Sequence, residues 1–265
     1  AAQGQVLLDG DELQPALQKR KRSELQKIQF VFQMADTALN PRQRIDHILG
    51  RPLGFYLGLK GKEKRRRVLE LLEMVELPHD FAGRYPEELS GGQKQRVNLA
   101  RALAASPEVL LCDEVISALD SIVGANVIEL LKRLRKQTGV SFVFISHDLS
   151  TIASFADKIV VLYAGRVVEQ GTADHVLSPP YHPYTRLLIS SVPELRVGWL
   201  EETMLTQEAQ AGIDRVVTLT AVGCPFFDRC PLAIKDTCDR ETPPVRQLNG
   251  EHTIECHRSE AEFLQ

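Results

Sequence analysis

The strongest constraint on the fold is a helix, a strand and a turn that follow one another between Tyr85 and Asp120. The turn LSGGQ, residues 89–93, opens a helix that we expect to run through Arg101, with Ser90 as its N-cap. Helix N-termini present unpaired N–H groups and a partial positive charge, and paired glycines let the backbone approach a phosphate closely. The turn is therefore a candidate anion site.

A strand with an acidic end follows this helix. Residues 109–114, VLLCDE, are an apolar run of strand length that ends in Asp113 and Glu114. A carboxylate at the end of a strand can hold Mg²⁺ through water, and its neighbour can orient or deprotonate an attacking water. Taken singly, a Ser-Gly-Gly turn is usually only a helix cap and an acidic pair only a solvated turn. Their order and spacing favour phosphate chemistry.

Two further segments predict strands of the same sheet. Residues 28–33, IQFVFQ, are rich in β-branched and aromatic side chains and end in Gln33. Residues 140–145, VSFVFI, form a near-continuous apolar run just before His147, as expected of a parallel strand buried on both faces. The other predicted elements are a hairpin turning at Asp9-Gly10, helices within 45–75 and over 122–136, and closing strands at 158–163 and 166–169.

This series of motifs resembles the ATP-binding subunit of an ABC transporter. Residues 89–93 are similar to the signature of that family, residues 109–114 to its Walker B strand and residues 117–120 to its D-loop. The resemblance implies an α/β fold, with an ABC-type P-loop NTPase core in which a mostly parallel sheet is flanked by helices. It also implies a helical signature subdomain and a small Cys-rich C-terminal region.

The resemblance further implies a role for each candidate residue. Glu114 would act on the attacking water, and His147 would contact the γ-phosphate of ATP. The candidates for binding ATP and Mg²⁺, in part across a dimer interface, are Gln33, Ser90, Gly91, Gly92, Gln93, Asp113 and Asp120. A lone Gln or His at the end of a strand is more often structural, and only the neighbouring motifs favour these roles.

The sequence departs from the family pattern in two places. Val115-Ile116 follow Glu114 where the family usually has Pro-Thr, but both carboxylates are present, so we expect the chemistry to survive. No G-x-x-x-x-G-K-[ST] phosphate loop (Walker A) occurs, and GFYLGLKGK at 54–62 has the wrong spacing. We expect the 265 residues to be an N-terminally truncated fragment with little ATP turnover on its own.

A second and narrower resemblance covers the C-terminal third. Residues 178–185, SPPYHPYT, predict a Pro-rich connection into an N-capped helix. They are similar to the His-Pro-Tyr segment of the oligopeptide and dipeptide transporter ATPases and of the related nickel importers. This segment distinguishes peptide-type importers from other ABC proteins.

Four cysteines follow with five, seven and seventeen residues between them: Cys224, Cys230, Cys238 and Cys256. A reducing compartment would argue against disulfides, and four thiolates can close a zinc site or hold an iron–sulphur cluster. The absence of a C-x2-C pair weakens the zinc interpretation. The resemblance to oligopeptide transporters implies a [4Fe-4S] cluster, with zinc as the second choice. Four unligated, partly buried thiols are the remaining alternative.

The motifs divide the chain into expected regions. These are the remainder of the ATPase core at 1–44, with Gln33 and the loop after it resembling the family's Q-loop, and a helical subdomain at 45–89. A core with the signature helix, Walker B, the D-loop and the H-loop of His147 follows at 90–175, then the His-Pro-Tyr connection and linker at 176–212 and a Cys-rich domain at 213–265.

Composition narrows the function. The net charge of −3 gives no basic excess for a nucleic-acid surface, and no apolar run reaches the roughly 18 residues that span a bilayer. We expect a peripheral protein at the cytoplasmic face of the cell membrane that hydrolyses ATP to power an importer of dipeptides or oligopeptides. Its expected partners are a second ABC ATPase subunit or half, transmembrane permease subunits and a periplasmic or extracellular substrate-binding protein, and no nucleic acid.

Two other functions remain open at this point. One is a soluble ABC ATPase that acts on nucleic acid or the ribosome, because such proteins share the signature and Walker B motifs. The other is a metal- or iron-responsive regulatory module whose working part is the cysteine region. The His-Pro-Tyr segment disfavours the first alternative, and the intact Asp113, Glu114 and His147 disfavour the second.

Overall fold

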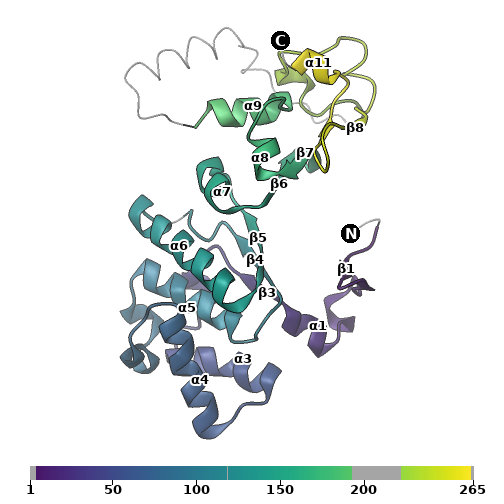
Figure 1. The fold of residues 1–265 in the computed structure, drawn as a ribbon. Helices are drawn as coiled ribbons and strands as arrows, with labels where there is room; N and C mark the ends of the chain where they lie inside the picture. Colours follow the sequence, from purple (N-terminus) through teal and green to yellow (C-terminus); the bar gives the residue numbers. More distant parts are fainter. Residues whose placement is uncertain (1–3, 118, 193–221, 264–265) are drawn as a thin grey trace. The chain divides into compact units, whose positions relative to one another are not determined.

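The chain folds as two compact units, Ala1–His147 and Asp148–Gln265 (Figure 1). The structure, a computed structural model, describes residues 4–117, 119–192 and 222–263. Within these residues, no helix is both long enough and apolar enough to cross a membrane. The polar linker expected at residues 195–213 lies outside the described residues.

The first unit holds a parallel sheet with helices packed on it (Figure 1). Its elements are β1 (Leu7–Leu8), β2 (Asp11–Glu12), a 3-10 turn (Leu17–Lys19), α1 (Arg22–Lys27), β3 (Ile28–Val31), α2 (Ala35–Ala38), α3 (Ile45–Leu57), α4 (Gly61–Met74), 3-10 turns at His79–Gly83 and Pro86–Glu88, α5 (Gly91–Leu103), β4 (Val109–Asp113), α6 (Ser121–Thr138) and β5 (Ser141–Ile145).

The strands of the parallel sheet run in the order β3-β4-β5, which places the Walker B strand in the middle. Val31 pairs with Cys112, and Asp113 pairs with Ile145. Leu110 and Cys112 are fully buried, whereas Phe30 and Val143 on the other face are exposed. Because side chains alternate along a strand, Asp113 points to the face opposite Cys112. The parallel register brings the ends of β3, β4 and β5 to one edge, where the candidate residues follow.

Helices α3, α4 and α5 pack together around apolar side chains such as Leu53, Leu71 and Val97, each with 0% exposure. Gly58 ends α3 in the left-handed conformation at φ 69°, which a residue without a Cβ adopts readily. These helices form at the positions predicted from apolar spacing. Asp120 and Gly139 cap the two ends of α6, which therefore begins and ends within two residues of the predicted span.

The second unit contains an antiparallel sheet in the order β6-β7-β9-β8. Its elements are α7 (Leu149–Phe155), β6 (Lys158–Tyr163), β7 (Arg166–Thr172), α8 (Ala173–Val176), α9 (Pro183–Ser190), a 3-10 turn (Phe227–Arg229), β8 (Val245–Gln247), β9 (Thr253–Glu255) and α11 (Glu260–Phe263). The predicted closing strands β6 and β7 thus share a sheet with two strands from the cysteine region, which the sequence analysis did not predict.

Candidate functional site

The signature turn forms the capped helix start that its sequence predicts. The Ser90 N–H donates to Gln93 Oε1 at 2.9 Å, and the Gln93 N–H donates to Ser90 Oγ at 3.4 Å. This reciprocal cap occupies both side chains and fixes the first turn of α5. The N–H groups of Gly91 and Gly92 lie in that turn, where a helix has no internal acceptor for them. The turn therefore offers backbone donors to an anion.

Gly92 is also required by packing inside the chain. A Cβ built on Gly92 would lie 2.8 Å from Cγ1 of Val123 on α6, whereas no atom of the described residues lies within 4 Å of a Cβ built on Gly91. Val is stiff about χ1 and cannot easily turn away. The absence of a side chain at Gly92 thus lets the signature helix and the helix after the D-loop approach each other closely.

We expect Gly92→Ala to lower the free energy of unfolding by about 1–3 kcal/mol, because the new methyl group overpacks against Val123. Combining it with Val123→Ala should recover most of the loss that Gly92→Ala causes. The matched control is Gly91→Ala, which has open space and should be neutral or slightly stabilising. Urea unfolding of the four proteins measures this, and equal effects of the two single glycine substitutions would contradict the packing argument.

Glu114 is held by two side chains that come from the neighbouring strands. Gln33 Nε2 donates to Glu114 Oε2 at 2.6 Å, and His147 Nδ1 lies 3.1 Å from Glu114 Oε1. The Glu114 N–H donates to Ile145 O at 2.9 Å, and Glu114 adopts a left-handed φ of 45°. A non-glycine residue at positive φ carries backbone strain of the kind that accumulates at functional sites. The structure thus brings together three of the predicted residues.

Of the two remaining acidic candidates, Asp113 lies next to Glu114, whereas Asp120 lies at the start of α6. Asp113 is the last residue of β4 and directly precedes Glu114. The Asp120 carboxylate accepts the Val123 N–H at 3.0 Å and so caps α6. Ser117 Oγ donates to Glu114 O at 2.9 Å and holds the start of the D-loop. The cap occupies the Asp120 carboxylate in this structure, so this residue is not brought into the Gln33, Glu114 and His147 group.

The segment 32–38, which contains Gln33, is bound to the signature helix by residues that the sequence motifs did not indicate. Asn98, which is fully buried, donates from Nδ2 to Phe32 O at 3.0 Å. The Arg101 guanidinium donates to Ala38 O and to Asn98 Oδ1, and Lys94 pairs with Asp36 at 2.5 Å. Side chains of α5 therefore hold the segment 32–38 at both of its ends and in its middle. The available signal was a polar residue, Asn98, between the apolar Val97 and Leu99 in the second half of α5.

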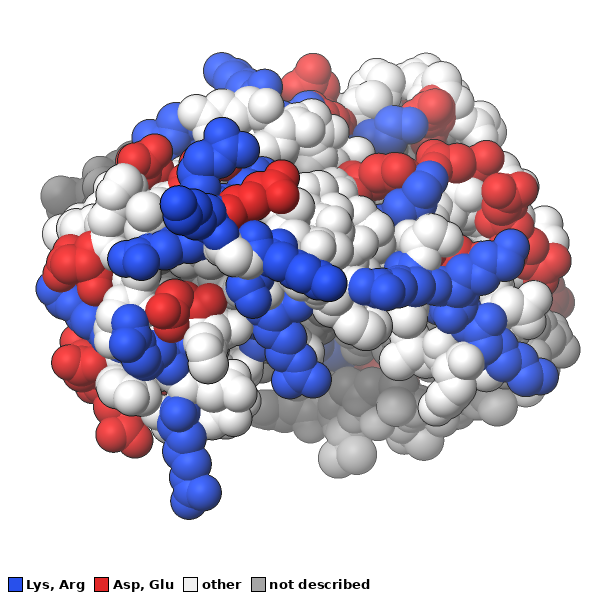
Figure 2. All heavy atoms as spheres, turned by 90° about the horizontal axis from the view of Figure 1, so that it is seen from below, with Lys and Arg blue, Asp and Glu red and all other residues white. Residues whose placement is uncertain are grey.

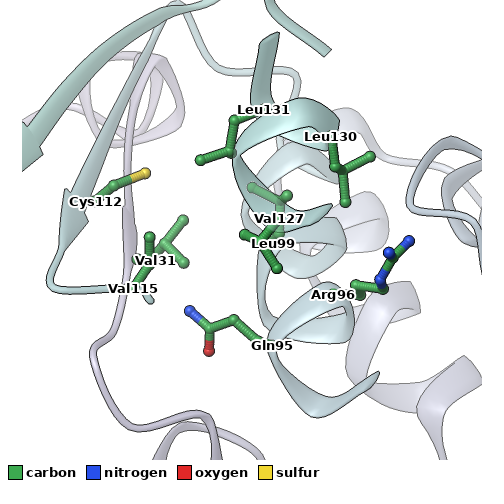
Figure 3. Close-up of a pocket in the computed structure, with 9 residues that line it drawn as sticks. All are labelled: Val31, Gln95, Arg96, Leu99, Cys112, Val115, Val127, Leu130 and Leu131. Carbon is green, nitrogen blue, oxygen red and sulfur yellow. The ribbon is translucent and has the colours of Figure 1, made fainter. Parts of the chain in front are cut away.

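A hollow of about 250 Å³, open solvent included, lies between β4, α5 and α6 (Figure 3). Its lining is apolar apart from Gln95 and Arg96, and the buried Gln95 Nε2 has no hydrogen-bond partner among the described residues. Burial raises the pKa of Cys112 to about 12, so this thiol is neutral. Cys112 points away from the Asp113 side of the sheet. The hollow is thus a packing defect behind the acidic strand end and not a nucleotide site.

The His-Pro-Tyr segment forms the start of α9, as predicted. The Tyr184 N–H donates to His182 Nδ1 at 3.1 Å, and Pro183 is the first helical residue. The His182 N–H in turn donates to Glu169 Oε2 on β7 at 2.9 Å. Tyr184 packs beside Phe226, with 5.5 Å between ring centroids. The segment therefore joins β7 to the cysteine region.

His182 should make the stability of the second unit depend on pH, because burial lowers its pKa from 6.5 to about 4. Above pH 6.5 the stabilising contribution of neutral His182 is fully present. Between pH 6.5 and about 4 the unfolded chain binds a proton that folded His182 does not, so we expect this contribution to fall by about 3 kcal/mol.

The measurement is urea unfolding of the chain across this pH range, compared with His182→Asn, which keeps an N-cap acceptor but does not titrate. Burial raises the pKa of neighbouring Glu169, which contributes with the opposite sign, so the difference between the two proteins is the quantity to follow. Parallel pH curves would contradict the prediction.

The four cysteines of the C-terminal region are free. Burial raises the pKa of Cys224 to about 11 and that of Cys230 to about 12, with smaller contributions from the neighbouring thiols. Burial also raises the pKa of Cys256, and Cys238 Sγ accepts the Ile234 N–H at 3.4 Å. The thiols thus lie within electrostatic range of one another.

They do not converge into a metal site. Across residues 4–117, 119–192 and 222–263, no group of three or more His, Cys, Asp or Glu side chains is placed to hold a metal ion. Among these residues the structure therefore supports neither the predicted [4Fe-4S] cluster nor the zinc alternative.

Two family models match the chain. The model described as ABC transporter matches residues 1–117, and the model described as oligopeptide/dipeptide transporter, C-terminal region, matches residues 168–238. The first covers the signature turn and Glu114, and the second covers the His-Pro-Tyr segment and three of the four cysteines.

Known proteins are similar over almost the whole chain. A Brucella abortus protein provisionally named a peptide import ATP-binding protein is 40% identical over 255 residues, which is 96% of this chain and 74% of that protein. The dipeptide transport ATP-binding protein DppF of Haemophilus influenzae is 39% identical, again over 96% of this chain and 74% of its own length.

A solved structure is also similar. It is the dimeric, post-hydrolysis form of the ATP-binding cassette MJ0796 bound to ADP and Pi, with 36% identity and a TM-score of 0.54 over 64% of this chain and 74% of that one. Its likeness confirms the predicted α/β fold of an ABC ATPase core. Both family matches and the relatives agree with the motifs at Ser90, Glu114 and His182. The chain belongs to the ABC transporter family of ATP-binding proteins, in its oligopeptide and dipeptide transporter branch.

Proposed function

We propose that the chain is the ATP-hydrolysing subunit of a membrane importer for dipeptides or oligopeptides. The observation that carries this proposal is that two side chains contact the Glu114 carboxylate: Gln33 Nε2 at 2.6 Å and His147 Nδ1 at 3.1 Å. The names of the relatives point to peptides as the transported class. The two family matches support an importer over a soluble ABC ATPase acting on nucleic acid or the ribosome, and over an iron-responsive module.

In the proposed reaction Glu114 takes up the proton of the attacking water, and its neighbours position it. A carboxylate held from two sides cannot swing away from the water, so catalysis here is largely a matter of positioning. His147 is well placed to reach the γ-phosphate because its side chain is 72% exposed while one ring nitrogen faces Glu114. Which ring nitrogen carries the proton is set by that contact.

Asp113 and Gln33 offer the carboxylate and amide oxygens that Mg²⁺ prefers, and we propose them as its protein ligands. Mg²⁺ sites of nucleotide enzymes use one or two protein ligands beside water and phosphate oxygens, so this pair fits the ion. When bound, the ion neutralises charge on the phosphates.

We propose that the signature turn serves the ATP of a second subunit. Ser90, Gly91, Gly92 and Gln93 form a preorganised helix start whose free N–H groups suit a phosphate. A dimer of such subunits would bring each signature turn to the opposite ATP, and the similar MJ0796 cassette is dimeric. Permease subunits and a substrate-binding protein complete the proposed assembly, with this chain at the cytoplasmic face of the membrane.

The division of labour along the chain is part of the proposal. Residues 1–44 and 90–175 supply the ATPase core, residues 45–89 the helical subdomain, residues 176–212 the connection and residues 213–265 the Cys-rich appendage. The boundaries of these five parts do not coincide with those of the two compact units. Strands β6 and β7, which belong to the proposed ATPase core, share a sheet with β8 and β9 of the Cys-rich appendage and so lie in the second unit.

The test is whether the rate of ATP hydrolysis by the transporter depends on the presence of peptide. The intact transporter, reconstituted in lipid vesicles, should hydrolyse ATP faster when its binding protein is loaded with peptide. Adding RNA or ribosomes should have no such effect. Hydrolysis that responds to nucleic acid and ignores peptide would overturn the proposal in favour of the soluble class.

A further inference from the structure

Positive charge is concentrated in one stretch of a chain that is acidic overall. Residues 17–67 contain fourteen Lys and Arg against four Asp and Glu, a net charge of +10 in a chain whose total is −3. This stretch includes α1, α3 and the first half of α4, and α1 and α4 both contact α3 in the first unit. The whole-chain charge therefore hides a strong local excess.

The structure separates the cations that are used internally from those that are not. In the run KGKEKRRR, residues 60–67, Arg66 and Arg67 both pair with Glu70, at 3.6 and 2.9 Å. The aliphatic stem of Lys64 lies beside Gly50 of α3. The remaining Lys60, Lys62 and Arg65 are exposed, and none of them has an ion pair within the described part of the chain. Three of the six cations in this run are thus available to bind a partner outside the chain.

An exposed aromatic ring lies among further cations next to this run. Phe55, in the last turn of α3, is 53% exposed, and the Arg22 guanidinium of α1 lies 4.3 Å from its ring centroid. Arg51 precedes Phe55 by four residues and lies on the same side of α3. We call Arg22, Arg51, Phe55, Lys60, Lys62 and Arg65 the basic surface. Figure 2 shows Lys and Arg side chains crowded on the face below α3 and α4.

We propose that the basic surface docks on anionic phospholipid headgroups of the membrane. Exposed cations without internal partners gain from the negative potential of a membrane surface, and an exposed aromatic ring beside them suits the headgroup layer. A nucleic-acid site fits less well, because single strands bind through several exposed stacking rings, whereas the Tyr56 ring beside Phe55, at 4.8 Å between ring centroids, is only partly exposed. Glu63 is the one acidic residue in the first turn of α4, and helical spacing turns it away from Lys62 and Arg65.

The experiment is flotation of the full chain with vesicles of phosphatidylcholine alone or with a third of phosphatidylglycerol. We expect binding only to the anionic vesicles, with a steep decrease as salt is added. Replacing three cations in Lys60→Gln, Lys62→Gln, Arg65→Gln should weaken vesicle binding by about tenfold or more. The matched control removes three exposed cations elsewhere, in Lys136→Gln, Arg186→Gln, Lys235→Gln, and should bind as the unchanged protein does.

Phe55→Ala keeps every charge and tests the ring separately; we expect weaker binding with an unchanged salt dependence. Unfolding curves show whether each variant folds. Equal loss in the two triple variants would mean that only net charge matters, and it would overturn the proposal. The proposal would also be overturned if the chain did not bind the anionic vesicles, or if it bound a single-stranded RNA more tightly than the vesicles. Because no step involves ATP, failure here leaves the proposed hydrolytic function untouched.

Discussion

Replacing Glu114 with Gln is expected to lower ATP hydrolysis by the intact transporter about 10²–10⁴-fold, the usual contribution of a positioned general base. The amide keeps the size of the carboxylate and can still meet Gln33 and His147, so nucleotide binding should persist. What it loses is the capacity to take up a proton from water. The loss should therefore fall on kcat and not on KM.

The control is Glu108→Gln at the opposite end of the same strand, where Glu108 is exposed and pairs with Lys27 at 3.0 Å. Its surface ion pair is worth little, and hydrolysis should be unchanged. Steady-state hydrolysis and equilibrium binding of ATP separate the two effects. Hydrolysis within about threefold of the unchanged transporter after Glu114→Gln would refute its assignment as the base.

The second large effect concerns Glu169, a buried acid that holds three segments of the second unit together. Glu169 and His252 are each 1% exposed, and His252 Nε2 lies 2.7 Å from Glu169 Oε1. The other carboxylate oxygen of Glu169, Oε2, accepts the His182 N–H, and the His175 ring stacks on the His252 ring. Glu169→Ala would leave these partners buried and unsatisfied. We expect it to lower the free energy of unfolding by about 3–5 kcal/mol.

The matched variant is Glu169→Gln, which keeps the volume and an oxygen for the His182 N–H and should therefore cost clearly less. Urea unfolding, followed by a signal from the second unit, measures both changes. If Glu169→Ala stays within about 0.5 kcal/mol of the unchanged protein, the contact is no more than a surface interaction and the account of this unit is wrong.

Much of the candidate site could be predicted from sequence because its residues follow strands. Gln33, Glu114 and His147 each come at or just after the end of a predicted strand, and parallel pairing of β3, β4 and β5 places those ends at one edge. The cap of Ser90 on α5 is a local interaction and was equally readable. Local patterns and the parallel topology together determine these positions.

Contacts between distant segments could not be predicted in the same way. The hydrogen bonds from Asn98 to Phe32 and from Arg101 to Ala38 depend on how α5 packs against the segment 32–38, which no spacing rule encodes. The pairing of Glu169 with Ile254, which joins β7 to β9, links residues far apart in sequence through very short strands. The cysteine spacing predicted a metal site because it records ligand types but not the positions of the thiols, and among the described residues no group is placed to hold a metal ion.

The most direct test of the account is the structure of the intact transporter carrying Glu114→Gln and trapped with Mg·ATP. We expect His147 to lie within hydrogen-bond reach of the γ-phosphate, at about 3 Å. We also expect the Ser90-Gly91-Gly92 turn of one subunit to meet the ATP held by the other. A signature turn remote from any nucleotide, or a γ-phosphate far from the edge formed by Gln33, Glu114 and His147, would contradict the central claim.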